Sequence, residues 1–193
     1  MRIFVLGVLF FNLALSQQIL LIRSNPEEIA LKINNQTAFF SEIQTEKGLF
    51  LRLRDEFSLE YGVSTELGKA ELPVIREFIE IPQEAEINIK FQIQNYKFQT
   101  LSCPIYPLQP PEPKCGPKPP FNYNEEFYQR DEFYPTEYAK ITDIVQIRHA
   151  RIAILEIYPF RYNPKQNLLE VVLEAEISLK LTGSDLAKTE EMY

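Results

Sequence analysis

The sequence predicts an all-β protein, an antiparallel β-sandwich or open barrel of jelly-roll-like kind, with a long proline-rich loop. Several short runs alternate apolar and polar residues with a period of two, and Pro, Asn and Gly separate these runs. Short alternating strands between turn residues are typical of sandwiches and barrels. No window keeps the i, i+3, i+4, i+7 spacing of apolar residues that an amphipathic helix requires.

The composition is that of a globular chain. Of the 193 residues, 45% are hydrophobic and 24% are charged, which is too apolar for a disordered chain and too charged for a polytopic membrane protein. Twenty-seven acidic residues against 20 basic ones give a net charge of -7. This charge argues against a nucleic-acid partner, because binding to phosphates needs a basic face. A chain of this length is expected to form one main domain.

Residues 1–16 have the layout of a signal peptide. Arg2 precedes the apolar run Ile3–Phe11, and Ala14 and Ser16 take the small-residue positions before a cleavage site. The run is too short to cross a bilayer as a helix, so we expect no stable membrane anchor. Cleavage after Ser16 would change the net charge from -7 to -8 through the loss of Arg2. The expected location is therefore secreted, either extracellular or periplasmic; the alternative is a buried first strand or helix.

The clearest alternation occurs in the segments 49–61, 87–93, 152–157 and 171–181. Successive side chains of a strand point to opposite faces, so each segment offers one apolar face to a core. Gln94-Asn95 is expected to turn the chain back, so that 96–101 forms the second arm of a hairpin. Another turn is expected at 160–167, which contains Asn163-Pro164.

Two segments depart from this alternation. Segment 62–82 holds Pro and Gly around an apolar stretch, and segment 103–120 contains eight of the 14 prolines. Proline fixes φ and has no N–H to donate, so 103–120 is expected to be a stiff, extended loop rather than a central strand. The polar, aromatic segment 121–138 follows it, and the tail 183–193 is expected to be a linker, a helix start or the beginning of a further domain.

The chain lacks the residues of a complete enzymatic site. His149 is the only histidine, and Cys103 and Cys115 lie next to or near prolines rather than at a nucleophile's strand–turn junction. One His and two Cys fall short of a zinc site, and no cofactor motif is present. Acidic residues at 125, 126, 131 and 132 provide oxygen ligands for Ca²⁺, but a solvated acidic loop is the expected state. Asn35-Gln36-Thr37 fits the N-glycosylation pattern.

Three stretches of the chain form an ordered set within residues 17–181. They are Gly68-Lys-Ala-Glu-Leu-Pro-Val74 with Ile81-Pro82, then Tyr123-Asn-Glu-Glu126 with Asp131-Glu-Phe-Tyr-Pro135, and then Arg148-His-Ala-Arg151 with Pro159-Phe-Arg-Tyr-Asn-Pro164. Together they resemble the propeptide of gingipain-type cysteine peptidases, peptidase family C25.

This resemblance implies a crescent-shaped, sandwich-like domain at residues 17–182, N-terminal to a caspase-like catalytic domain. Such a domain assists the folding of the catalytic domain and blocks its active site until cleavage. It is not an enzyme by itself. Its partner would be a C25-type catalytic domain specific for Arg or Lys, in cis or in trans.

The resemblance also implies a basic residue that reaches the substrate cleft from a loop. In the family pattern this residue comes seven positions after Ile-x-Pro, and here Lys114 follows Ile105-Tyr106-Pro107 at that spacing. Pro113 restricts the backbone just before it. Arg130 and Lys118 are the second and third candidates.

Two features of this loop depart from the family pattern: its prolines, and the cysteines that bracket it. Prolines stiffen the unbound loop, so less conformational freedom is lost on docking. A Cys103–Cys115 bridge would close the loop and is worth about 3 kcal/mol in the loop-closure model. The alternatives are that both thiols are free or pair elsewhere, and that the segment is an ordinary solvated linker.

Two other functions stay open at this stage. The aromatic segment 121–138 also suits a secreted β-sandwich binding or adhesion module for glycans or a cell surface. The third hypothesis is that the chain is the N-terminal part of a longer peptidase precursor.

Overall fold

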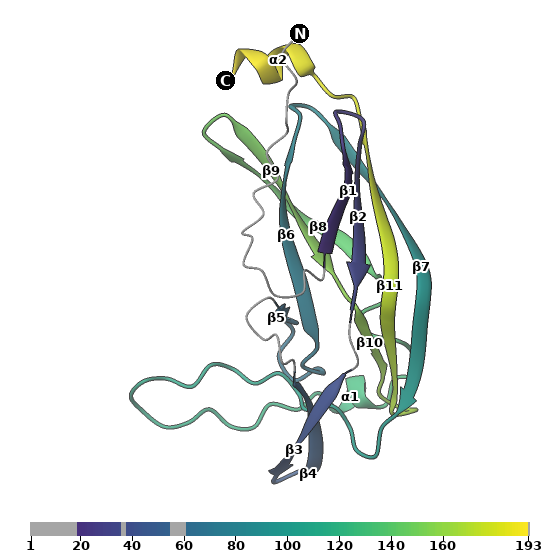
Figure 1. Cartoon of the computed structure of the whole chain (residues 1–193). Coiled ribbons are helices and arrows are strands. Elements are labelled where there is room, and N and C mark those ends of the chain that lie inside the picture. Colours follow the sequence, from purple (N-terminus) through teal and green to yellow (C-terminus); the bar gives the residue numbers. More distant parts are fainter. Residues whose placement is uncertain (1–18, 36–37, 55–60, 193) are drawn as a thin grey trace.

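The computed structural model describes residues 19–35, 38–54 and 61–192, most of which lie in three antiparallel sheets (Figure 1). The expected signal peptide, most of the alternating residues after Arg54, and Gln36-Thr37 of the glycosylation pattern therefore lie outside the described residues.

The first sheet is built around β11 (Leu168–Thr182), which is also the longest strand that the sequence predicted. On one edge β11 pairs with β7 (Glu86–Thr100) along its whole length. On the other edge it pairs with β10 (Phe160–Asn163) and then with β2 (Glu28–Asn34), and β1 (Ile19–Ser24) pairs with β2. The alternation from Ala175 to Leu181 buries every second side chain of β11.

The predicted hairpin at Gln94-Asn95 is wrong, because β7 continues through both residues as one strand. A change of register opposite Glu174 accommodates Asn95, and the Gln94 side chain donates a hydrogen bond to Glu176 on β11 (2.8 Å). The continuous β11 ladder thus overrides the local turn preference of the two polar residues. The predicted turn at 160–167 is correct only in its second half, since Phe160–Asn163 form β10.

The second sheet has the order β5 (Tyr61–Val63), β6 (Pro73–Ile81), β9 (Ala150–Ile157), β8 (Ala139–Ile147). β6 comes from the apolar stretch of the segment 62–82, which the sequence had set apart from the alternating strands. Its paired neighbour β9 is the strand predicted at 152–157, but its buried face holds Ala153, Leu155 and Ile157 rather than Ile152 and Ile154, which the alternation had favoured and which are half-buried.

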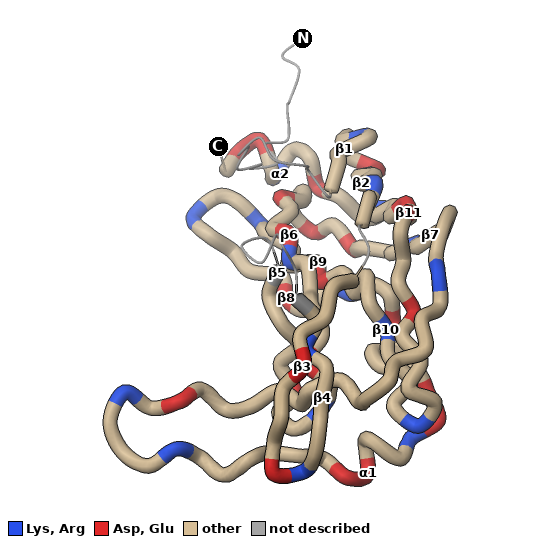
Figure 2. Tube along the Cα trace, turned by 60° about the horizontal axis from the view of Figure 1, so that its bottom comes forward, with Lys and Arg blue, Asp and Glu red and all other residues tan. Residues whose placement is uncertain are grey.

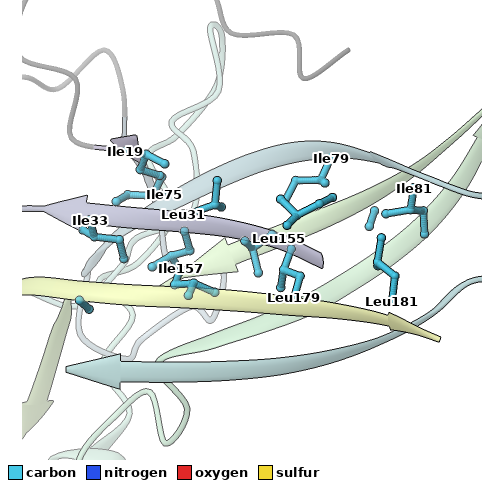
Figure 3. Packing of buried hydrophobic residues seen from close by; sticks show 14 of the residues in the cluster. Ile19, Leu31, Ile33, Ile75, Ile79, Ile81, Leu155, Ile157, Leu179 and Leu181 are labelled. Carbon is cyan, nitrogen blue, oxygen red and sulfur yellow. The ribbon is translucent and has the colours of Figure 1, made fainter. Parts of the chain in front are cut away.

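The two sheets face each other across the main hydrophobic core (Figure 3). This core takes side chains from β1, β2 and β11 on one side and from β6 and β9 on the other. Its largest fully buried members are Ile29, Leu31, Ile33, Ile79, Ile81, Leu155, Ile157 and Ile177. The predicted antiparallel sandwich is confirmed, with open sheets that do not close into a barrel.

The third sheet is the hairpin of β3 (Phe39–Thr45) and β4 (Gly48–Arg54), which lies at the same end of the molecule as the long loop and α1 (Glu125–Tyr128) (Figure 1). A second core fills this end. It consists of Leu51, Ala70, Leu72, Leu101, Ile105, Phe127, Tyr128, Phe160, Tyr162, Leu169 and Val171.

The tail 183–193 contains α2 (Leu186–Glu191), which the Asp185 side chain caps by accepting from the Lys188 backbone N–H. Thr189 of α2 accepts a hydrogen bond from the Gln83 backbone (2.9 Å), so this helix is fastened to the turn between β6 and β7. In the part of the chain that the structure describes, no helix has the length and apolar character to span a membrane.

Candidate functional site: a braced proline-rich loop

The loop between β7 and α1 leaves the body and returns to it at one place (Figures 1 and 2). Residues 111–118 are all exposed. The loop has an outgoing leg, 103–110, and a returning leg, 119–124, and backbone hydrogen bonds hold the outgoing leg to the body. Tyr106 N–H donates to the Leu51 carbonyl (2.7 Å), and Leu108 N–H donates to the Lys69 carbonyl (2.8 Å). The extended loop that the prolines predicted is confirmed.

The Gln109 side chain clamps the base of the loop. Its Oε1 accepts from the Asn122 backbone N–H (2.8 Å), and its Nε2 donates to the backbone carbonyls of Asn122 (2.8 Å) and Pro107 (2.9 Å). One amide thus joins both legs, just before the exposed part begins.

Aromatic side chains fill the space under this clamp. The ring of Phe50 in β4 contacts Tyr106 on the outgoing leg, and Phe121 and Tyr123 on the returning leg, with centroids 6.0–6.2 Å apart. The Tyr128 hydroxyl donates to the Ile105 carbonyl (2.6 Å), and burial holds the pKa of this phenol well above its usual range. The base of the loop is therefore packed and hydrogen-bonded, while its outer part is solvated.

The three candidate cations differ in their surroundings. Lys114 is exposed beside Pro113 near the end of the loop, and it makes no ion pair with any residue that the structure describes. Lys118, whose side chain is 78% exposed, pairs with Glu112 across the loop (3.0 Å). Arg130 lies outside the loop, beyond α1, and pairs with Glu126 (2.5 Å) and Glu132 (3.5 Å). The structure brings Lys114 and Lys118 together on one loop and leaves Arg130 apart.

Cys103 and Cys115 are free thiols in this structure, half-buried and exposed respectively. Cys103 lies at the base of the loop beside Ser102, and Cys115 lies in its exposed part, next to Lys114. The bridge between them stays a prediction.

The acidic residues after the loop are paired with cations and amides. Glu126 and Glu132 bind Arg130, and Asp131 accepts from Asn163 (3.0 Å) and Gln166 (2.6 Å). Among the described residues, no group of His, Cys, Asp and Glu has an arrangement that would hold a metal ion. His149 lies in the turn between β8 and β9.

The family model Propeptide_C25 matches residues 16–192. The chain belongs to the C25 propeptide family. The resemblance found in the sequence is thereby confirmed over nearly the whole chain. This C25 propeptide is a propeptide domain of gingipain-type peptidases and is not catalytic by itself.

Two solved structures from Porphyromonas gingivalis share the fold of this C25 propeptide. The complex of the RgpB pro- and mature domains matches with a TM-score of 0.72 and 21% identity, over 88% of this chain and 86% of that one. The structure that describes the zymogenic latency of gingipain K matches with a TM-score of 0.71 and 23% identity, over 85% and 92%. Among proteins of curated function, none is significantly similar to this chain.

Sequence reasoning missed the Gln109 clamp and the ion pairs of Arg130. Gln109 and Asn122 lie 13 positions apart without any motif between them, so no local pattern announces their contact. The Glu126–Arg130 pair has i, i+4 spacing, which was the one available signal that Arg130 is neutralised locally.

Proposed function

We propose that this C25 propeptide keeps the catalytic domain of a C25-type cysteine endopeptidase inactive by placing the proline-rich loop in its substrate cleft. The observation that carries the proposal is the braced, exposed loop with Lys114 near its end, in a chain that belongs to the propeptide family. Lys114 would take the place of a substrate's basic side chain.

Lys114 suits this role better than the other two cations. A cation that enters a specificity pocket must give up its present partners, and Lys118 and Arg130 would leave Glu112, Glu126 and Glu132 uncompensated. Lys114 has no such partner among the described residues.

The loop is also prepared for docking. Its prolines and the Gln109 clamp restrict the unbound conformation, so less entropy is lost when the loop is fixed in a cleft. Bracing at the base leaves residues 111–118 free to enter a partner.

The proposal has three further parts. The domain assists the folding of the peptidase domain, the two act in cis within one precursor or in trans, and residues 1–16 direct export to the extracellular space or periplasm. The two similar structures concern a complex of pro- and mature domains and zymogenic latency, which supports a peptidase domain as the partner.

The aromatic residues that suggested a glycan-binding module are used inside the protein. Phe127 and Tyr128 are 2% and 5% exposed, and Tyr123 stacks on Tyr128 with centroids 4.5 Å apart. A stacking platform for sugars needs exposed ring faces, so this observation favours the propeptide function.

The test is inhibition of the cognate C25 catalytic domain by the separate propeptide. We expect Lys114→Ala to weaken inhibition tenfold or more, which corresponds to about 1.4 kcal/mol of binding free energy. Lys118→Ala is the matched control on the same loop and should change inhibition less than threefold. Lys114→Arg reports whether the cleft prefers Lys or Arg.

If the unmodified chain does not inhibit the peptidase, the proposed function is wrong. If it inhibits but Lys114→Ala inhibits equally well, the function stands and Lys114 loses its role.

A further inference from the structure

Each leg of the loop is fastened to the body without help from the loop's outer end. The outgoing leg is held through Tyr106 and Leu108, as described above, and Glu71 N–H adds a bond to the Tyr106 carbonyl (2.9 Å). The returning leg is held by Asn124, whose N–H donates to the Gly68 carbonyl (3.0 Å). A break in the chain between the legs would therefore leave both legs in place.

The legs are also held to one another. Gln109 joins them at the base, and the Glu112–Lys118 ion pair joins them further out (3.0 Å). The ion pair is exposed and weak by itself, but it links groups on opposite sides of Lys114 and Cys115. The ends produced by a break at 114–115 would remain close together.

Two peptide bonds in the outer part of the loop follow a lysine, and one of them is a suitable substrate for a peptidase. The bond after Lys118 leads to Pro119, whose ring nitrogen has no hydrogen and stiffens the chain, so it is a poor substrate. The bond after Lys114 leads to Cys115, which is exposed and has a free thiol. A peptidase that accepts Lys114 thus meets the Lys114–Cys115 bond.

We propose that the docked peptidase cuts the Lys114–Cys115 bond reversibly, and that the braced legs and the Cys115 thiol return the chain to its intact form. This inference rests on the proposed function, because it requires Lys114 to occupy the cleft of a cysteine peptidase. The loop then acts as a substrate that is cut without being released.

Cleavage of the Lys114–Cys115 bond needs only the groups of the propeptide and the peptidase. The catalytic thiolate attacks the Lys114 carbonyl carbon, the C–N bond breaks, and the Cys115 amine leaves with a proton from the peptidase's general acid. Lys114 is then held as a thioester, and Cys115 carries a new amino terminus beside its thiol.

Cys115 can reverse this step in two stages. Its thiolate attacks the thioester carbonyl and displaces the catalytic thiolate. The Cys115 amine next attacks the same carbonyl through a five-membered ring, loses a proton and releases the Cys115 thiol. The product is the original peptide bond, and no water has been consumed.

Resealing competes with hydrolysis because the amine and thiol stay next to the thioester. Groups held in place react as if present at very high concentration, and the clamp supplies this proximity after the cut. The thiol must be free, as it is in the structure, so a Cys103–Cys115 bridge and this mechanism exclude one another.

The experiment starts from chain that has been nicked at Lys114–Cys115 by brief digestion with a trypsin-type serine peptidase and then purified. In this nicked chain Lys114 ends in a carboxylate, so the catalytic thiol first condenses with that carboxylate to form the thioester and releases one water, which is the reverse of thioester hydrolysis; the two stages described above then follow. The nicked chain is incubated with the cognate C25 catalytic domain under a thiol reductant, and intact mass is followed over time. We expect intact chain to reappear, and the ratio of intact to nicked chain to reach the same value from either starting form.

Two variants test the parts of the mechanism. Gln109→Ala removes the clamp and should lower the equilibrium ratio of intact to nicked chain tenfold or more. Cys115→Ser keeps the size of the residue and should slow resealing tenfold or more, because an oxygen nucleophile exchanges poorly with a thioester. The mass of the resealed chain provides a readout that loop packing alone would not change.

The outcomes separate this inference from the proposed function. If the intact chain fails to inhibit, the proposed function falls. If the intact chain inhibits but the nicked chain stays nicked, only the inference is overturned. Resealing of Cys115→Ser at the rate of the unmodified chain would overturn the part assigned to the thiol.

Discussion

At the scale of single residues, Gly68 shows how closely the body approaches the base of the loop. Its φ of +77° lies in the left-handed region, and a Cβ placed on it would come within 2.5 Å of the Asn122 side-chain oxygen and 3.1 Å of the Asn124 backbone nitrogen. We expect Gly68→Ala to lower the free energy of unfolding by about 1–3 kcal/mol, through backbone strain and displacement of the returning leg. Urea denaturation measures this change.

Gly48 provides the matched control for the strain. Its φ is +114°, also positive, but a Cβ there would meet no atom within 4 Å. Gly48→Ala should therefore cost less than Gly68→Ala and leave inhibition of the peptidase unchanged. Equal losses of stability in the two variants would show that the close contact with Asn122 does not add to the cost of placing alanine at position 68.

At the scale of elements, Asp131 ties the segment after α1 to the turn between β10 and β11. Hydrogen bonds from Asn163 and then Gln166, followed by the nearby Lys165 ammonium (3.6 Å), hold the pKa of Asp131 below its usual range. A carboxyl whose pKa is lower in the folded state stabilises the fold above its unfolded pKa, which is about 4, and this contribution is lost as the pH falls through the folded value.

Asp131→Asn should therefore lower the urea midpoint at pH 6, and this difference should shrink as the pH falls below about 4, the pKa of the unfolded aspartate. The measurement is the difference in midpoint between the two proteins at pH 6 and at pH 3. Glu132→Gln is the control, because Glu132 is the neighbouring carboxylate and its ion pair with Arg130 is long, at 3.5 Å. A difference for Asp131→Asn that persists unchanged at pH 3 would contradict the argument.

The elements also show what the sequence could and could not reveal. The alternation in 171–181 predicted β11 and its buried face, because alternation reflects burial on one face, which is a local property. The alternation in 152–157 predicted the strand β9 but not the face that it buries. The continuity of β7 was missed because a partner strand decides whether Gln94-Asn95 turns.

The candidate site divides in the same way. The proline run predicted an exposed loop with Lys114 in it, since proline's effect on the backbone is local. The clamp by Gln109 and the aromatic contacts of Phe50 depend on residues brought together only by the fold. Local sequence therefore indicated where the loop is, but not what braces it.

At the scale of the whole molecule, two hydrophobic cores share one strand. β11 contributes Leu169 and Val171 to the core at the loop end, and Ala175 and Ile177 to the core between the two large sheets. Because β11 is continuous and pairs with β7 over both regions, loss of one core removes support from the other. We therefore expect both cores to unfold in a single transition.

A truncation in each core tests this expectation. Leu155→Ala empties part of the core between the sheets and Leu72→Ala part of the core at the loop end; both side chains are 0% exposed, so each change should cost about 2–5 kcal/mol. Phe78→Ala, at 59% exposure on β6, is the control and should change stability by about 0.5 kcal/mol. Tyrosine fluorescence and circular dichroism during urea unfolding should shift together in both core variants, with an unchanged slope. Two separated transitions in either variant would mean that the loop end unfolds independently, and the brace under Lys114 would then depend on the smaller core alone.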